Sequence, residues 1–318
     1  MKLSAVIPLL LTGATIMQLF KTVLGDVREK DLGITLAHEH ICCYSEYLFQ
    51  MAGDKYLDKK QLLNIAVDYL KFLKENYGLN TFVDCTPVNI GRDIELLKAV
   101  SQKSGVNIIC STGFYYTEES VLYNSSAELI AEYIIKDAEN INAGIIKCAV
   151  ENERLSDFNV KLLKSSAMAQ LKLNLPIVLH TNANNKNGLK ALEILLSVGV
   201  KPQAITVGHL SDTENLDYIK QIANQGCFIG LDRLYCDCSE EYISKKINVI
   251  VELCNAGYND RILLSHDALF FNGFEANPAI NEHPRFSYCF EYILPRLSKE
   301  IVEQLMKINP IKMFCCGD

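Results

Sequence analysis

The sequence lacks the features that mark a membrane-spanning or nucleic-acid-binding protein. Acidic residues outnumber lysines and arginines, and the formal net charge of −7 argues against a nucleic acid or an anionic membrane as partner. The apolar run at residues 5–11 is too short to cross a bilayer. No low-complexity linker divides the 318 residues. The length fits one large α/β domain or two smaller ones, and we expect one domain over residues 24–318, with residues 1–23 as an extension that leads into it.

The twelve cysteines lack the pattern of a zinc motif. None belongs to a CxxC pair, although three close groups remain weak metal candidates, namely Cys42-Cys43, Cys236-x-Cys238 and Cys315-Cys316. Several others lie inside apolar runs, where a free thiol behaves as a small hydrophobic group. A disulfide scaffold is typical of short secreted chains, so we expect mostly reduced thiols and a cytoplasmic protein.

The N-terminal residues leave an alternative to the cytoplasm. Lys2, the apolar run and the small residues that follow also fit a secretory signal, which would make residues 1–16 a signal peptide of an exported protein. Met17 opens a segment that resembles a natural start. We favour the interpretation that the residues before Met17 are an upstream or non-native extension.

Short apolar runs alternate with longer amphipathic segments along the chain. The eight apolar runs cover residues 33–37, 81–85, 107–111, 144–149, 176–180, 204–209, 227–231 and 261–265. The segments between and after them repeat apolar residues at spacings of three and four, as helices do, and cover residues 58–77, 90–104, 127–139, 156–173, 188–198, 212–225, 239–256 and 298–308. Ser211 or Asp212 is the expected N-cap of the sixth helix.

Eight strands alternating with eight helices predict parallel pairing, because each connection between strands contains a helix. Eight such units in about 300 residues fit a closed (β/α)8 TIM barrel. An open doubly wound sheet is the alternative. That fold predicts a glycine-rich GxGxxG loop after the first strand, and the sequence has none there.

Polar residues of one chemical kind stand at the ends of the predicted strands. His38 and His40 are two apart in an extended segment, so their side chains project together while Glu39 points away. Paired imidazoles suit a divalent metal. The later strands end in or carry further candidates, which are Lys147, His180, His209 and Asp267. In a (β/α)8 barrel all these ends meet on one rim, where active sites lie.

Four imidazoles and a carboxylate can hold two divalent ions, but this set lacks a bridging ligand. A lysine ammonium has no lone pair. A desolvated lysine amine that adds carbon dioxide becomes a carbamate, which is an anionic bridge with two oxygens. We therefore interpret Lys147 as an N6-carboxylysine candidate, with an ordinary charged lysine as the alternative. Zinc is the first choice of metal, and manganese, cobalt or iron would accept the same ligands.

This residue set resembles the metal site of the phosphotriesterase-like family of the amidohydrolase superfamily, in particular its lactonase branch. The segments that carry the resemblance are Thr35-Leu-Ala-His-Glu-His40, Asn89-Ile-Gly-Arg-Asp-Ile94 and Gly208-His-Leu-Ser-Asp-Thr213, and the similarity runs from about Leu24 to Phe314. The resemblance implies that one metal takes His38, His40 and Asp267. It implies that His180 and His209 hold the second metal, with carbamylated Lys147 and a hydroxide as bridges, and that the protein is a homodimer.

The reaction expected of such a site is metal-assisted hydrolysis of a small molecule. Asp267 would orient the attacking hydroxide and accept its proton. Tyr115 and Arg233 resemble residues that the lactonase branch places over its substrate. Tyr115 would bind the ring oxygen or protonate the leaving alcohol, and simple aromatic packing is its alternative. Arg233 would steer an anionic product, or else form a structural salt bridge with an acid such as Asp237.

Substrate choice is expected to lie in the loops. Arg285, Tyr288, Lys245 and Lys246 would suit an anionic tail such as the phosphate of a phosphorylated sugar lactone. Exposed cations are often simply solvated, so that role has an alternative too. A rival substrate is a plain or acylated lactone, with Phe270, Phe271 and Phe274 lining the entrance.

The sequence thus predicts a binuclear-metal lactonase with weak phosphotriesterase activity. A dedicated phosphotriesterase or an amidase on the same site is the alternative. A noncatalytic metal-binding barrel is disfavoured, because every type of ligand for a catalytic site is present.

Overall fold

The computed structural model of the protein describes residues 18–235 and 237–315. The predicted extension before Met17, and also Cys236 and Cys316, lie outside the described residues. The ten cysteines within them are free thiols. Within the same residues no helix is both long and apolar enough to cross a membrane.

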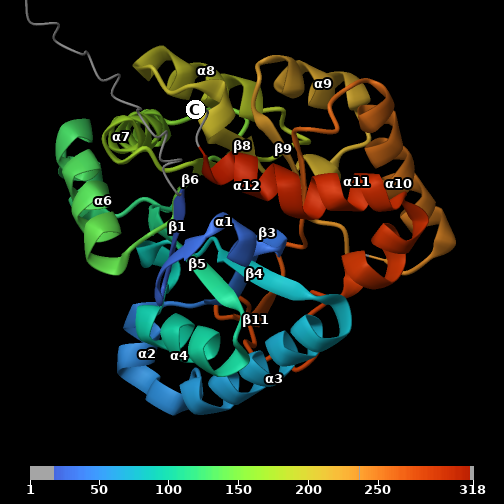
Figure 1. Ribbon diagram of the computed structural model, residues 1–318. Helices are drawn as coiled ribbons and strands as arrows, with labels where there is room; N and C mark the ends of the chain where they lie inside the picture. Colours follow the sequence, from blue (N-terminus) through green and yellow to red (C-terminus); the bar gives the residue numbers. More distant parts are fainter. Residues whose placement is uncertain (1–17, 236, 316–318) are drawn as a thin grey trace, which may run out of the picture.

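A parallel sheet of nine strands forms the centre of the molecule and is surrounded by helices (Figure 1). The strands are β3 (Ile34–Cys43), β4 (Leu79–Asp84), β5 (Asn107–Gly113), β6 (Ile145–Ala149), β7 (Ile177–His180), β8 (Ile205–Val207), β9 (Phe228–Leu231), β10 (Ile262–Leu264) and β11 (Leu269–Asn272). From β3 to β10 each strand pairs with the next in the chain. Each of the eight predicted apolar runs overlaps one of these strands, so the (β/α)8 prediction is confirmed.

The eighth strand of the barrel is split in two. Its first half, β10, pairs with β9, whereas its second half, β11, pairs with β3, with Leu269 opposite His40. Residues 265–268 loop out between the halves. The amide of Asp267 donates to the carbonyl of His38 at 3.0 Å, and the amide of His40 donates to the carbonyl of Ala268 at 3.0 Å. These bonds close the barrel at the loop that carries Asp267.

Strand β3 is longer than the sequence predicts. We expected it to end at residue 37, but it continues to Cys43 because β11 supplies a partner for its second half. The pairing of β3 with β4 shifts register between Leu36 and Glu39. His38 and His40 therefore lie inside a strand, level with the C-terminal ends of the neighbouring strands.

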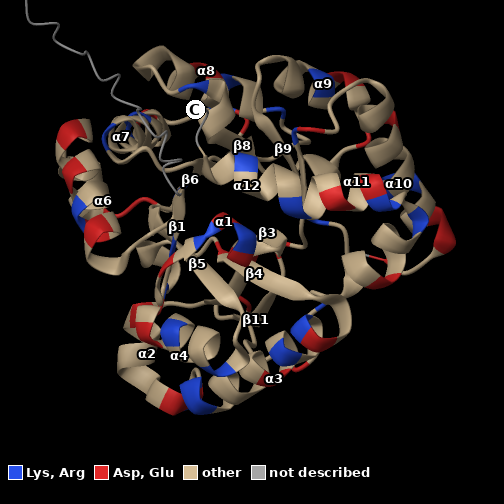
Figure 2. Ribbon diagram, viewed as in Figure 1, with Lys and Arg blue, Asp and Glu red and all other residues tan. Residues whose placement is uncertain are grey.

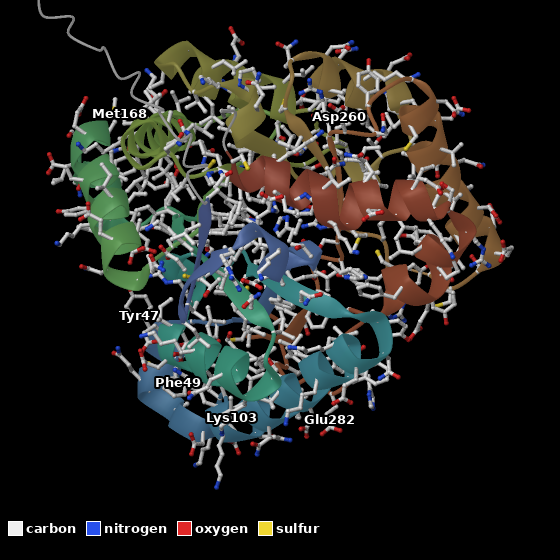
Figure 3. The ribbon with its side chains drawn as sticks, viewed as in Figure 1. Tyr47, Phe49, Lys103, Met168, Asp260 and Glu282 are labelled. Atoms are coloured by element: carbon white, nitrogen blue, oxygen red, sulfur yellow. The ribbon has the colours of Figure 1, made fainter. Side chains whose placement is uncertain are left out.

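Helices cover the outer face of the sheet. They are α3 (Lys59–Tyr77), α4 (Ile94–Ser104), α6 (Ala127–Ile141), α7 (Asp157–Leu173), α8 (Gly188–Val198), α9 (Leu216–Asn224), α10 (Glu240–Asn255), α11 (Lys299–Glu303) and α12 (Asn309–Phe314), with a π-helical stretch, Gln304–Ile308, between the last two. Figure 2 shows charges of both signs on these helices, while the strands are mostly uncharged. Side chains fill the space between strands and helices (Figure 3).

Local capping explains where the helices begin. The Asp58 carboxylate accepts from the amides of Lys60 and Gln61 at the start of α3, and Ser156 forms a capping box with Asn159 at the start of α7. Helix α9 is capped by Asn215. The prediction of Ser211 or Asp212 as this cap is wrong, because Leu210–Asp212 forms a 3₁₀ turn.

A hairpin precedes the barrel. Strand β1 (Leu19–Thr22) pairs with β2 (Gly25–Arg28) in antiparallel fashion, so the boundary expected between residues 23 and 24 falls in its turn. The amide of Val23 donates to the carbonyl of Ile108 in β5 at 2.9 Å. Short helices α1 (Glu29–Leu32), α2 (Glu46–Ala52) and α5 (Ser120–Asn124) complete the chain.

Candidate active site

The six residues predicted as metal ligands lie together at the C-terminal end of the barrel. Strand β3 supplies His38 and His40, β6 supplies Lys147, and β7 ends in His180. His209 stands two residues past β8, and Asp267 lies in the loop between β10 and β11. The four histidines and Lys147 are buried.

The side chains converge in two groups. In the first, Nε2 of His40 lies 3.1 Å and Nε2 of His38 lies 3.6 Å from Oδ1 of Asp267. In the second, Nδ1 of His180 lies 2.7 Å from Nε2 of His209. The Nζ of Lys147 lies 2.6 Å from Nε2 of His38. Lys147 thus lies beside the first group, and the assignment of the two groups to two metals stays a prediction.

A buried carboxylate that the sequence analysis missed fixes two of the imidazoles. Oδ2 of Asp232 lies 2.6 Å from Nδ1 of His38, and its Oδ1 lies 3.1 Å from Nδ1 of His209 and accepts from the His209 amide at 2.7 Å. Burial opposes the charge of Asp232, but His209 and His38 outweigh it and hold the pKa of Asp232 below its ordinary value. Asp232 follows β9 directly, so the rule of inspecting strand ends would have found it.

The other two histidines also have partners on the side of the ring away from the site. Nδ1 of His40 lies 2.8 Å from Oγ1 of Thr86, and Nε2 of His180 lies 2.9 Å from Oε2 of Glu151. Glu151 was not singled out from the sequence either. Such partners fix the tautomer and orientation of a metal-ligating imidazole.

Two residues of the site adopt the left-handed backbone conformation. His209 has φ 62° and Asp267 has φ 52°, a region that residues other than glycine seldom occupy.

Glu39, on the opposite side of β3, holds the loop of Asp267 in place. Its carboxylate accepts from the amides of His266 and Ala268 at 2.9 and 3.0 Å. It also accepts from Oγ of Ser265 at 2.8 Å and lies 2.6 Å from Nδ1 of His266.

The donor set fits two divalent cations. Burial, together with nearby Lys147, lowers the pKa of His38 to about 4, and burial lowers the pKa of His209 to about 3, so both imidazoles are neutral at pH 7 and able to ligate. When the outer nitrogens of His180 and His209 donate to Glu151 and Asp232, the two inner nitrogens present lone pairs to each other at 2.7 Å. A shared cation satisfies both lone pairs. Lys147 is buried, its Nζ lies beside Nε2 of His38, and among the described residues no carboxylate pairs with it.

A cavity of about 430 Å³ opens above these residues. Its lining includes His40, Lys147, His180 and Asp267 from the metal set, together with Tyr115, Tyr116, Arg233, Cys43, Thr117, Asn272, Ile90, Leu269 and Phe274. Of the three phenylalanines expected at the entrance, Phe274 lines the cavity, whereas Phe270 and Phe271 are buried in the core.

Tyr115 stands over the second group of ligands. Its ring meets the ring of His180 edge-on, with 5.2 Å between the centroids. The amide of Tyr115 donates to Oδ1 of Asn89 at 2.8 Å, and Nδ2 of Asn89 donates to the carbonyl of Tyr115 at 3.3 Å. Within the described residues the Tyr115 hydroxyl has no hydrogen-bond partner. Burial raises the pKa of Tyr115 above its ordinary value, so the phenol keeps its proton.

Arg233 is held by two carboxylates. Its Nε donates to Oδ2 of Asp267 and its Nη1 donates to Oδ2 of Asp212, both at 2.8 Å. The alternative salt bridge with Asp237 is not formed, since the Asp237 carboxylate accepts from Ser239 instead. Oγ of Ser211 accepts from the Arg233 amide at 2.8 Å. Ser211 and Asp212, which were predicted as alternative caps of α9, therefore both bind Arg233.

The four residues expected to bind an anionic tail lie outside the lining of the cavity. Arg285 donates to the carbonyl of Tyr235 at 2.7 Å, and the hydroxyl of Tyr288 donates to the carbonyl of Asp237 at 2.5 Å. Lys246 donates to the carbonyl of Ser211 at 2.5 Å, and Lys245 pairs with Glu241 at 3.1 Å. Arg285 and Tyr288 therefore anchor the loop that follows β9.

The barrel, the convergent imidazoles and the buried lysine define a metal-dependent hydrolase. Residues 18–314 match the sequence model of the phosphotriesterase family, so this chain belongs to that family.

Two of three similar proteins are named as hydrolases, in agreement with this class. The aryldialkylphosphatase of Saccharolobus solfataricus is 34% identical over 306 residues, which cover 91% of this chain and 96% of that protein. The phosphotriesterase homology protein of Mycobacterium tuberculosis is 28% identical and covers 92% of this chain and 96% of its own length. The N-acetyltaurine hydrolase of Xenopus tropicalis is 27% identical, with 91% of this chain and 96% of that protein covered.

Proposed function

We propose that this protein is a lactonase that opens the ring of a small, uncharged lactone with the help of two divalent cations, zinc first among them. The observation that carries the proposal is the Tyr115 phenol, which faces the cavity beside His180 and has no partner among the described residues. When the ring of a lactone opens, the ring oxygen becomes the oxygen of an alcohol. That leaving oxygen needs a hydrogen-bond donor or a proton. A protonated phenol over the metal ligands meets that need.

Six residues would hold the cations. His38, His40 and Asp267 would bind one, His180 and His209 would bind the other, and Lys147 as N6-carboxylysine would bridge them. When bound, the cations would polarise the substrate carbonyl and lower the pKa of the attacking water.

Asp267 would accept the proton of the attacking water. Arg233 holds its Oδ2 at 2.8 Å, and His40 lies 3.1 Å from its Oδ1, so the carboxylate has one orientation. Burial opposes the charge of Asp267, but His209, His40, His38 and Arg233 hold its pKa well below the ordinary value. Arg233 would thus act on the carboxylate, since its guanidinium is already bound by Asp267 and Asp212.

The lining of the cavity favours an uncharged substrate. Its arginine, Arg233, is already bound by Asp267 and Asp212, Lys147 would serve as the bridging carbamate, and apolar Ile90, Leu269 and Phe274 are part of the lining. A plain or acylated lactone suits this lining better than a phosphorylated sugar lactone does. Binding of a phosphate by Arg285, Tyr288, Lys245 and Lys246 stays a prediction, as do the homodimer and the cytoplasmic location.

A second candidate activity is the hydrolysis of phosphotriesters, favoured by the relative that is 34% identical and named aryldialkylphosphatase. Purified, metal-loaded protein should be assayed against a panel of plain, acylated and phosphorylated lactones, together with an aryl dialkyl phosphate and an N-acyl amide. We expect the highest kcat/KM for a lactone without charge. Turnover of the phosphotriester or the amide with no lactone cleaved would overturn the proposal.

A further inference from the structure

We propose that Glu151 is a positioning residue for His180, and that it sets the metal affinity of the site that His180 and His209 form. The inference rests on the proposed function, in which His180 is a metal ligand. It assigns a task to a carboxylate and a loop that the proposed chemistry does not otherwise use.

The His180 ring lies between Glu151 and the site. Its Nε2 is 2.9 Å from Oε2 of Glu151, while its Nδ1 is 2.7 Å from Nε2 of His209. A proton on Nε2 that is donated to the carboxylate leaves the lone pair of Nδ1 facing the site. Glu151 thus selects both the tautomer and the rotation of the ring that a metal needs.

An asparagine-rich loop, residues 182–187, holds Glu151 in turn. Nδ2 of Asn182 donates to Oε1 of Glu151 at 2.7 Å, so both carboxylate oxygens are fixed. Nδ2 of Asn185 donates to the carbonyl of Glu151 at 3.1 Å. The side-chain oxygen of Asn182 accepts from the amides of Asn184 and Asn185, both at 3.1 Å.

The side chains of this loop serve the carboxylate rather than the substrate. None of residues 182–187 is among those that line the described cavity. The loop follows β7 directly after His180 and Thr181, so the segment that provides the ligand also provides the clamp on its partner. This connection ties the position of Glu151 to that of His180.

The outer partners of the four imidazoles are unequal. Asp232, which serves both His38 and His209, has a side chain only 2% exposed, and Thr86 is buried as well. The Glu151 side chain is 36% exposed. Solvent competes with the bond to His180, whereas it does not reach the bonds of Asp232. The bond between Glu151 and His180 is therefore the most exposed of these outer bonds, and a change at Glu151 should move the release of the metal that His180 holds.

The test is the variant Glu151→Gln, with Glu153→Gln as matched control. The control makes the same chemical change two residues away, on an exposed side chain that has no hydrogen bond to the described residues. A glutamine at 151 cannot accept from both His180 and Asn182, because one end of its amide is a donor.

Each protein is loaded with zinc, dialysed against graded chelator and assayed for bound metal per chain by elemental analysis. We expect Glu151→Gln to lose one metal at about 10- to 100-fold lower free chelator than the control, while the other metal is retained. Asn182→Ala should shift the release in the same direction by less. Equal release from Glu151→Gln and Glu153→Gln would overturn the inference.

A His180→Asn variant separates this inference from the proposed function. If His180→Asn keeps both metals as tightly as the wild type, the proposed ligand role of His180 is wrong. If His180→Asn loses one metal and Glu151→Gln does not, only the role of Glu151 fails. Thermal melting of the loaded proteins checks that each variant folds.

Discussion

The floor of the cavity comes from strands and strand ends, whereas its rim comes from loops. On the floor, His38, His209 and Asp232 are buried and each has at least two polar partners within the site. On the rim, Phe274 is exposed and Tyr115 has a hydroxyl without a partner among the described residues. A floor built this way has one geometry, so it sets the reaction. The rim is the part that we propose to select the substrate.

The largest effect on activity should come from removing the Asp267 carboxylate, which also lies on the floor of the cavity. We expect Asp267→Asn to lower kcat on a lactone by about 10³-fold, because the amide is a poor proton acceptor. Asparagine tolerates the left-handed backbone that position 267 requires, so the fold should survive. Steady-state kinetics measure the loss, with Asp237→Asn as a control on the neighbouring loop. An Asp267→Asn enzyme within tenfold of wild type would refute the role.

The next effect concerns the carboxylate that fixes two imidazoles of the floor. Asp232→Asn should weaken metal binding by about 10- to 100-fold. It should also lower the free energy of unfolding by about 2 kcal/mol, since hydrogen bonds to a buried charge are lost. Chelator titration and denaturant unfolding of the metal-free protein measure the two losses separately. Unchanged unfolding would show that Asp232 does not stabilise the floor.

On the rim, Tyr115→Phe should lower kcat on a lactone by about tenfold, equal to one hydrogen bond of about 1.4 kcal/mol in the transition state. Metal content should not change, because Tyr115 contacts His180 through its ring. Since burial raises the pKa of Tyr115, the loss should be the same at about pH 7 and about pH 9. If the loss in kcat disappears for lactones whose leaving alcohol is acidic, Tyr115 acts on the leaving oxygen.

The smallest effect is expected at Arg285. Its bond to the Tyr235 carbonyl lies outside the cavity, so Arg285→Ala should change kcat/KM for an uncharged lactone by less than about threefold. The same variant assayed on a phosphorylated lactone decides the competing prediction. A large rise in KM for that substrate alone would show that Arg285 binds the phosphate. The substrate-binding rim would then extend beyond the cavity to Arg285.

The floor could be predicted from the sequence because strand ends are easy to locate and meet on one rim. His38, Lys147, His209 and Asp267 all follow from that rule. Asp232 and Glu151 also stand just past a strand, but nothing in the sequence distinguishes a partner of a metal ligand from an ordinary acidic residue. Glu39 points away from the two histidines as predicted, whereas its bonds to the loop of Asp267 could not be predicted, because they depend on the split of the eighth strand.

The rim could not be predicted to the same degree, because loop contacts depend on the paths of several loops at once. Arg285 and Tyr288 read as ligands for an anion, yet in the fold they donate to carbonyls of another loop. Ser211 and Asp212 read as helix caps, yet they bind Arg233. In each case local sequence identifies the hydrogen-bonding group but not its partner.

The split of the eighth strand places Asp267 at the seam where the barrel closes. Any cation that binds Asp267 together with His38 and His40 would link the eighth strand of the barrel to its first strand, β3. Metal loading should therefore stabilise the whole barrel and raise its melting temperature with metal concentration. Loss of metal would therefore lower both the melting temperature and the activity of the protein, since both would depend on the cation at Asp267.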